Sequence, residues 1–232
     1  MYELYIANKN YSSWSLRPWL LLSERGIAFR ERLVPFAQGD GTSWHAFRAF
    51  SPNGKVPCLH HGNAVVWDSL AIVEYLAERH PDVWPSDPSA RAWARCAAAE
   101  MHSGFAALRG HCGMNCGVRI RLPEDLPAAL HADIARIDEL WNEGLNRFGG
   151  PFLAGAAFGA ADAFFAPVAF RVQTYGLALG DAAGAYAGRL LELPAMRRWH
   201  ADALQETWRD PEHEREAEQS GTLLRDLRVA AG

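Results

Sequence analysis

Two short motifs in the first third of the chain could bind a small charged peptide. Val56-Pro57 stands at the start of a predicted strand, and Asp68-Ser69 opens a predicted amphipathic helix soon after it. Because proline cannot donate a ladder hydrogen bond, Pro57 leaves a strand edge partly unpaired. A cis bond here would turn the amide and carbonyl of Val56 outward, where they could hold an extended peptide by strand addition. A structural turn is the alternative, since only about 5–6% of X-Pro bonds are cis.

Asp68 and Ser69 have two interpretations at the start of their helix. Both residue types are favoured as helix caps, which is the structural interpretation. In the functional interpretation, free amides, the helix dipole and the Ser69 hydroxyl accept a ligand carboxylate, while Asp68 meets an ammonium. The presence of both motifs favours binding, because they place a backbone edge and a carboxylate pocket on the same side of one small sheet.

Serine hydroxyls crowd the loop before the first predicted helix, in the run Tyr11-Ser12-Ser13-Trp14-Ser15-Leu16-Arg17-Pro18-Trp19. A ligand thiol at this loop has a pKa of about 8.5 and is mostly protonated at neutral pH. A helix N-terminus supplies about 0.3–1 kcal/mol, less than the ~1.36 kcal/mol of one pKa unit. A hydroxyl that donates to the thiolate adds about 1.5–3 kcal/mol. The loop can therefore ionise a bound thiol only if a serine assists the dipole.

Taken together, these motifs resemble the glutathione S-transferase family, strongly over residues 1–80 and diffusely over 89–210. The serine loop is similar to the Ser-Ser-Cys-Ser-x-Arg loop of zeta-class transferases and maleylacetoacetate isomerases, with Trp14 where that class has cysteine. The resemblance implies glutathione as the co-substrate, a cis Val56-Pro57 bond and a γ-glutamyl group at Asp68-Ser69. The family usually has Glu or Gln before this serine, so Asp68 is a shorter variant.

The resemblance also implies roles for the side chains around glutathione. Of the catalytic candidates, Ser12 is the first choice for the sulfur by alignment with the zeta loop and Ser13 is close behind, while Ser15 is expected to cap the helix. Lys55 could reach the glycyl carboxylate or be solvated, and His45 lies in the polar segment before it.

A second pocket, for the electrophile, is expected beside the first. Its candidate lining residues are Trp14, His102, Asn115, Arg119 and Arg121. A solvated helix face with some interdomain contacts is the alternative for those beyond Trp14. Arg17 either neutralises the site or bridges the two domains. The run 100–105 also resembles a recurring proteobacterial subgroup of the family.

The hydrophobic pattern predicts a thioredoxin-like α/β domain at 1–80 and an all-α domain at 89–232 that forms the electrophile pocket. The first domain has the order strand, helix, strand, hairpin and helix, expected at 2–7, 15–25, 28–34, 57–66 and 68–79. Three prolines at 80–88 predict a rigid linker at 81–88. From Ser89 onward no strand is expected, and the charged tail beyond Asp210 is expected to be a loosely attached helix.

Two polar clusters are set aside. Asp162 follows Gly159 by three residues, at the family's helical capping box, so it is expected to serve folding and not catalysis. His111, Cys112 and Cys116 lie within six residues. Zinc usually takes about four ligands and no second paired motif is found, so no metal is expected.

The amino-acid composition argues against nucleic acid and membrane as binding partners. The chain has 232 residues, of which 49% are hydrophobic and 22% charged, and its net charge is −4. No basic face indicates nucleic acid, and no run approaches the roughly 18 apolar residues of a membrane span. Four cysteines do not suggest a disulfide framework, so a cytoplasmic location is expected.

The sequence therefore predicts a serine-type glutathione transferase, homodimeric by family resemblance. It would stabilise the thiolate of bound glutathione for attack on a small hydrophobic electrophile. A zeta-like isomerase or reductive dehalogenase is the second enzymatic hypothesis, and Trp14 in the cysteine position counts against it. The hypothesis from another class is a non-catalytic glutathione-binding module, although a pure scaffold need not keep both motifs and the serines.

Overall fold

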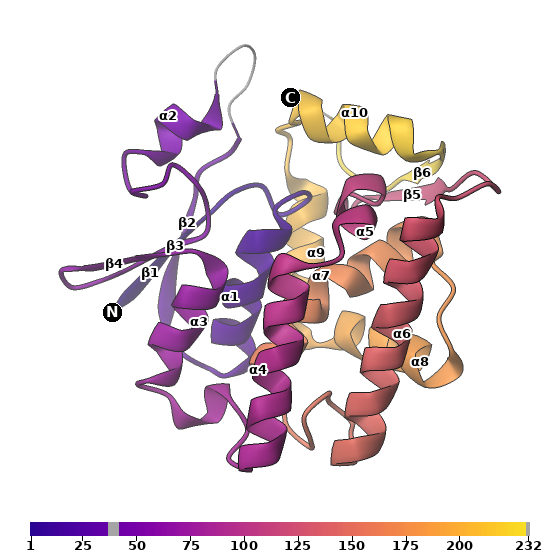
Figure 1. The fold of residues 1–232 in the computed structure, drawn as a ribbon. Helices are drawn as coiled ribbons and strands as arrows, with labels where there is room; N and C mark the ends of the chain where they lie inside the picture. Colours follow the sequence, from indigo (N-terminus) through magenta and orange to yellow (C-terminus); the bar gives the residue numbers. More distant parts are fainter. Residues whose placement is uncertain (37–41, 231–232) are drawn as a thin grey trace.

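The computed structural model describes residues 1–36 and 42–230, which form a small sheet with its helices and a mostly helical region beside it (Figure 1). The first part contains β1 (Tyr2–Ile6), α1 (Ser13–Glu24), β2 (Phe29–Leu33), α2 (Ser43–Phe47), β3 (Cys58–His61), β4 (Ala64–Trp67) and α3 (Ser69–Ala77). The second part contains η1 (Pro81–Val83), α4 (Pro88–Ser103), α5 (Ala106–His111), β5 (Val118–Arg121), α6 (Ala128–Phe148), α7 (Ala160–Tyr175), α8 (Asp181–Glu192), α9 (Pro194–Gln205), α10 (Pro211–Ser220) and β6 (Thr222–Asp226).

The first sheet has the strand order β2-β1-β3-β4. β1 runs parallel to β2, with Tyr2 opposite Phe29, and antiparallel to β3. β1 alternates buried and half-buried residues, because successive side chains point to opposite faces of a strand. A βαβ unit followed by a hairpin and a helix is the predicted thioredoxin-like order, and the structure confirms it.

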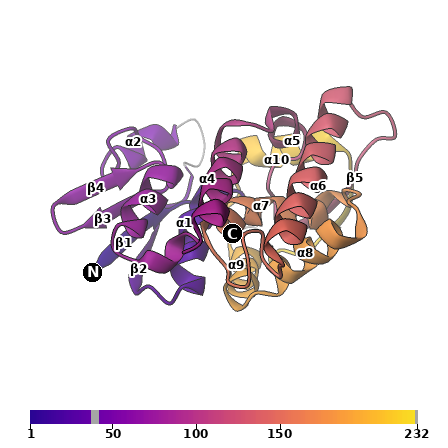
Figure 2. The ribbon, with the colours of Figure 1, turned by 60° about the horizontal axis from the view of Figure 1, so that its bottom comes forward.

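Helix α1 joins the two parts of the molecule. It packs against α3 on the sheet side and against α7 and α9 on the helical side, and Figure 2 shows it where the two parts meet. It begins at Ser13, two residues before the predicted start, and Gly26 follows its C-cap Arg25 as the predicted C′ residue. Gly26 has a φ of +63°, and the Ile27 N–H donates to the carbonyl of Leu22 at 2.9 Å, as in a Schellman motif.

The expectation that no strand follows Ser89 is wrong. β5 and β6 pair antiparallel, with a register shift between Arg119 and Ile120. Each strand spans no more than five residues, and every residue of β6 is exposed. β5 alternates apolar and polar residues over only four positions, which is too short to stand out in the sequence, and β6 does not alternate. Their pairing joins segments that lie about a hundred residues apart in the chain.

Asp162 is a folding residue, as predicted. It is 1% exposed, and its carboxylate accepts hydrogen bonds from the N–H groups of Gly159 (2.9 Å) and Leu153 (3.0 Å) and from the Tyr186 hydroxyl (2.7 Å). Burial raises the pKa of Asp162 to about 6. One side chain thus joins the start of α7, the loop before it and α8.

We expect Asp162→Ala to lower the free energy of unfolding by about 2–4 kcal/mol, because it leaves buried donors without an acceptor. Urea denaturation measures this loss. Asp87→Ala is the control, since Asp87 accepts one hydrogen bond, from the Ala90 N–H at the start of α4, and should cost about 1 kcal/mol. Equal losses in the two variants would contradict the role of the Asp162 network.

Candidate functional site

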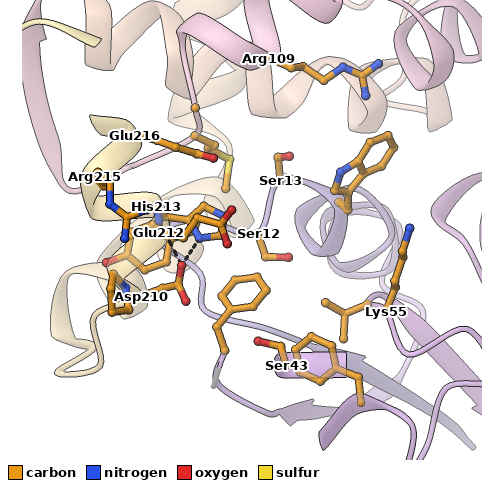
Figure 3. A pocket seen from close by; sticks show the side chains of 18 of the residues that line it. Ser12, Ser13, Ser43, Lys55, Arg109, Asp210, Glu212, His213, Arg215 and Glu216 are labelled. Carbon is orange, nitrogen blue, oxygen red and sulfur yellow. Dashed lines mark hydrogen bonds and ion pairs between the residues drawn. The ribbon is translucent and has the colours of Figure 1, made fainter. Parts of the chain in front are cut away.

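A cavity of about 690 Å³ lies between the two parts of the molecule, at the N-terminal end of α1 (Figure 3). The sheet side contributes the serine loop, α2 and the residues before Pro57. The helical side contributes Arg109 of α5, Arg171 of α7 and residues 210–213, 215 and 216 at the start of α10. The cavity therefore has walls from both parts, which is the arrangement expected of a two-substrate site.

The serine loop presents two hydroxyl groups to this cavity. Ser12 and Ser13 line it, and Figure 3 shows both side chains turned toward it. The Ser12 hydroxyl donates to Oγ of Ser15 at 2.7 Å, and Ser15 Oγ also accepts from the Ala7 N–H at 3.3 Å. The Ser13 hydroxyl has no hydrogen bond to another described residue.

The expected role of Ser15 as the helix cap is wrong. The N–H groups of Tyr11 and Ser12 both donate to the Asn8 carbonyl, and this turn starts the helix earlier, with Ser12 in the N-cap position. Ser15 then falls in the first turn of α1, is fully buried and does not line the cavity. It can influence a ligand only through Ser12.

The Val56-Pro57 peptide bond is cis, as the resemblance implied. Lys55 and Val56 line the cavity, and Lys55 is exposed. Neither backbone group of Val56 has a hydrogen-bond partner among the described residues. An open donor and acceptor on the cavity wall could pair with the backbone of an extended ligand.

Asp68 caps α3, and the Ser69 hydroxyl takes no part in the cap. The Asp68 carboxylate accepts from the Leu70 N–H at 2.8 Å. Asp68 also has a φ of +75°, a backbone conformation that costs a non-glycine residue about 1–3 kcal/mol and gathers at functional sites. Ser69 is 1% exposed, and its Oγ has no hydrogen-bond partner among the described residues. Asp68 is therefore the cap of α3, and neither Asp68 nor Ser69 lines the cavity.

Trp14 links the cavity to Asp68 through His102. Its ring lines the cavity, stacks under the Arg17 guanidinium at 4.1 Å and lies 5.3 Å from the ring of His102. His102 Nε2 in turn is 3.5 Å from the Asp68 carboxylate. His102 does not line the cavity, and burial lowers its pKa.

Arg17 bridges the two parts of the molecule. It is 1% exposed, and its guanidinium packs against Trp14 of its own helix and, at 4.9 Å, against Phe164 of α7. Its Nε and Nη1 have no hydrogen-bond partner among the described residues. Burial in these rings lowers the pKa of Arg17 well below its usual value.

Asn115 and Arg119, which were expected in the electrophile pocket, do not line this cavity. Asn115 is buried, and its Oδ1 accepts from the Gly117 N–H at 3.3 Å. Arg119 lies in β5 and donates to the carbonyls of Cys116 and Val118. The antiparallel pairing of β5 with β6 draws this segment away from the opening.

Two other candidates also lie outside the cavity lining. His45 is exposed on α2, which lines the cavity with Ser43 and Phe47 instead. Arg121 is exposed in β5.

The cysteines near His111 are buried and form no metal site with other described residues. Burial raises the pKa of Cys112 to about 11, and Cys116 is buried as well. Within 1–36 and 42–230, no three potential metal ligands lie together and no helix is long and apolar enough to cross a membrane.

The C-terminal segment is the part of the site that sequence reasoning missed. α10 was expected to be loosely attached, but Glu214 accepts from the Tyr11 hydroxyl at 2.7 Å and from Arg228 Nη2 at 2.9 Å. Arg228 also pairs with Asp226 at 2.8 Å, and its side chain is 5% exposed. Burial raises the pKa of Tyr11, which therefore stays a hydrogen-bond donor. These contacts fix α10 beside the serine loop.

Comparisons with known proteins agree with this geometry. The family model for the glutathione S-transferase N-terminal domain matches residues 11–79. Glutathione S-transferase 1 of Dianthus caryophyllus is 30% identical over 171 residues, which cover 71% of this chain and 74% of that protein. The chain belongs to the glutathione S-transferase family.

Other relatives come from different classes of transferase. A probable maleylacetoacetate isomerase of Caenorhabditis elegans is 33% identical over 107 residues, 45% of this chain and 48% of that protein. The crystal structure of a theta class glutathione S-transferase from the citrus canker pathogen Xanthomonas axonopodis pv. citri, with glutathione bound, is 27% identical, covers 85% of this chain and 95% of its own, and has a TM-score of 0.61. The comparisons support the family without selecting the zeta-like subgroup.

We expect Arg228→Met to loosen α10 on this transferase, because it leaves Glu214 half-buried without its cation, a loss of about 2–4 kcal/mol. Hydrogen exchange of the amides at 211–220 should accelerate by about tenfold or more, since ~1.4 kcal/mol corresponds to tenfold. Arg225→Met in the exposed strand β6 is the matched control. Unchanged exchange in α10 would show that the Arg228 contacts do not hold it.

Proposed function

We propose that the protein is a glutathione transferase that ionises the thiol of bound glutathione with a serine hydroxyl and presents it to a small electrophile. One observation carries this proposal. The hydroxyls of Ser12 and Ser13 and the open backbone of Val56 face the same cavity from two different segments. A solved relative, 27% identical, binds glutathione, which supports the same ligand here.

The residues on the sheet side suit the three parts of glutathione. The backbone of Val56, held in place by Pro57, suits the cysteinyl unit, and the Lys55 ammonium suits the glycyl carboxylate. The γ-glutamyl end carries a carboxylate and an ammonium on one carbon, for which Ser69 and Asp68 supply a hydroxyl and a carboxylate. The buried Ser69 Oγ has no partner among the described residues, and a ligand carboxylate would satisfy it.

The serine hydroxyls and the start of α1 would stabilise the thiolate. Two hydroxyls that share a hydrogen bond can reverse its direction. If Ser15 donates to Ser12, then Ser12 is able to donate its own proton toward the sulfur. Ser15 is thus proposed as a positioning residue, and Ser13 as the second candidate donor.

We expect Ser12→Ala to lower kcat with 1-chloro-2,4-dinitrobenzene by about 10–100-fold at pH 7, because a hydrogen bond to a charged group contributes about 1.5–3 kcal/mol. The Kd for glutathione should change by less than about twofold, and ultraviolet absorbance of the thiolate should show a raised thiol pKa. Ser23→Ala, at the far end of α1, is the control. Equal turnover in Ser12→Ala would move the role to Ser13 or to backbone amides.

We expect Ser69→Ala chiefly to weaken glutathione binding, by about 5–30-fold in Kd, because it removes a hydroxyl that would donate to the γ-glutamyl carboxylate. Isothermal calorimetry measures the affinity, and the thiol pKa of the saturated complex should be unchanged. An unaltered Kd would refute the γ-glutamyl pocket.

Two other functions remain as candidates. A glutathione-dependent isomerase is favoured by the similarity to the probable maleylacetoacetate isomerase, and its test is isomerisation of a cis double bond beside a carbonyl. A non-catalytic binding module would be indicated by folded protein that neither binds a glutathione resin nor turns over an electrophile.

The proposal includes the domain bounds, a homodimeric assembly and a cellular location. We place the glutathione-binding domain at 1–80, the linker at 81–88 and the helical domain at 89–232. The proposed homodimer would cover the exposed Val65 and Trp67 of β4, which are 39% and 45% exposed. The proposed location is the cytoplasm.

A further inference from the structure

The wall of the cavity formed by α5 and α7 carries two guanidinium groups that form no ion pair with a carboxylate of the described residues. Arg109 comes from the end of α5 and Arg171 from the middle of α7, and both line the cavity. Neither forms an ion pair with any carboxylate of residues 1–36 and 42–230 within 4 Å. Glutathione's own carboxylates are accounted for on the sheet side, so these two cations are left for another ligand.

Arg171 is a buried side chain whose guanidinium is held in one direction, unlike a cation on the surface. It is 3% exposed, and its Nε donates to the Cys112 carbonyl at 2.8 Å, which fixes the direction of the guanidinium. Its Nη1 is buried and has no hydrogen-bond partner among the described residues. A buried, unpaired guanidinium is costly, and an anionic ligand would offset that cost.

Arg109 lies near it on the same wall. Its guanidinium donates to the carbonyls of Met101, His102 and Gly104, and it stacks on the Trp14 ring at 5.0 Å. Figure 3 shows it on the side of the cavity away from Ser43. Carbonyl oxygens orient a guanidinium without neutralising it, so its positive charge remains available to the cavity.

No acidic residue that is described and lines the cavity forms an ion pair with Arg109 or Arg171 within 4 Å. Asp210, Glu212 and Glu216 line it from the start of α10, at the left of Figure 3, while Arg109 lies at the top. Glu216 Oε2 lies beside Gly113, the residue after Cys112. Asp210 accepts from the ring of His213 at 2.6 Å. The carboxylate that most affects Arg109 is Asp133 of α6, which accepts from the Leu108 N–H at 2.9 Å. The Arg109–Arg171 wall is therefore cationic.

We infer that the second substrate carries a carboxylate, which Arg171 and Arg109 bind while its electrophilic carbon faces the glutathione sulfur. This rests on the proposed function and narrows it, since the sequence predicted only a small hydrophobic electrophile. Two guanidinium groups match a carboxylate well, because each offers paired N–H donors in a planar fork. The Trp14 ring between the anion site and the serines supplies an apolar surface for the body of such a substrate.

The test uses two electrophiles that differ only in charge, 4-chloro-3,5-dinitrobenzoate and 4-chloro-3,5-dinitrobenzamide. In each reaction the glutathione sulfur forms a bond to the chlorinated ring carbon, chloride leaves with the electron pair of the broken C–Cl bond, and the thiol proton passes to buffer. Rates are divided by the uncatalysed rate of the same electrophile with glutathione.

The wild-type protein should prefer the benzoate by about tenfold or more in normalised kcat/KM. Arg171→Met should remove most of this preference through a higher KM for the benzoate, while the KM for glutathione and the rate with the benzamide stay within about threefold. Arg109→Met should act in the same direction and gives a second test if Arg171→Met does not fold. Arg121→Met, which removes an exposed cation in β5, should retain the preference.

A wild-type protein that prefers the benzamide, or an unchanged preference in both arginine variants, would overturn the inference. If neither electrophile reacts, the transferase proposal fails. The anion site is then tested by calorimetry, which measures the Kd of the unreactive 3,5-dinitrobenzoate and 3,5-dinitrobenzamide. Tighter binding of the benzoate, lost in Arg109→Met, would keep the anion site without the transfer reaction. Equal binding of the two would reject the anion site as well.

Discussion

The geometry of the site depends on how the backbone before Ser12 is held. Glu206, which follows α9, accepts from the N–H groups of Lys9 (2.7 Å) and Asn10 (3.3 Å). The indole of Trp199 donates to the Lys9 carbonyl at 2.9 Å. A buried loop must have partners for its backbone groups, and those of Lys9 and Asn10 come from the helical part. The position of the serine hydroxyls on the sheet part is therefore set by the other part of the molecule.

This dependence explains why the cavity lies where the two parts meet. α1 is packed on both sides, so its N-terminal dipole and the serines cannot shift without disturbing both cores. The sheet side presents an open backbone edge at Val56, and the helical side presents cations and α10. Each part alone would expose only half of the site. The candidate site therefore belongs to the interface, and the Trp14–Arg17–Phe164 stack is among the contacts that join the two parts.

Much of the fold could be predicted from the sequence because its signals are local. A short stretch of sequence is enough to predict each of three features: the strand-helix-strand order, the C′ glycine Gly26 after α1 and the capping box at Asp162. The motifs that contain Ser12, Ser13, Lys55 and Val56, which line the cavity, are local in the same way. Asn115 and Arg119 do not line it, and the place of Arg119 depends on pairing with β6, about a hundred residues away. Arg171 was missed because, in a helix as apolar as α7, only the structure shows which way a single cation points and that it lacks a partner.

The contact between Lys9 and Glu206 spans 197 residues of chain. Translation proceeds from the N-terminus, so the serine loop leaves the ribosome long before the carboxylate that fixes its amides has been made. The growing polypeptide can complete its small sheet while the loop still lacks its final shape. The serine loop therefore reaches its final shape late in biosynthesis, when the segment from α9 to β6 docks.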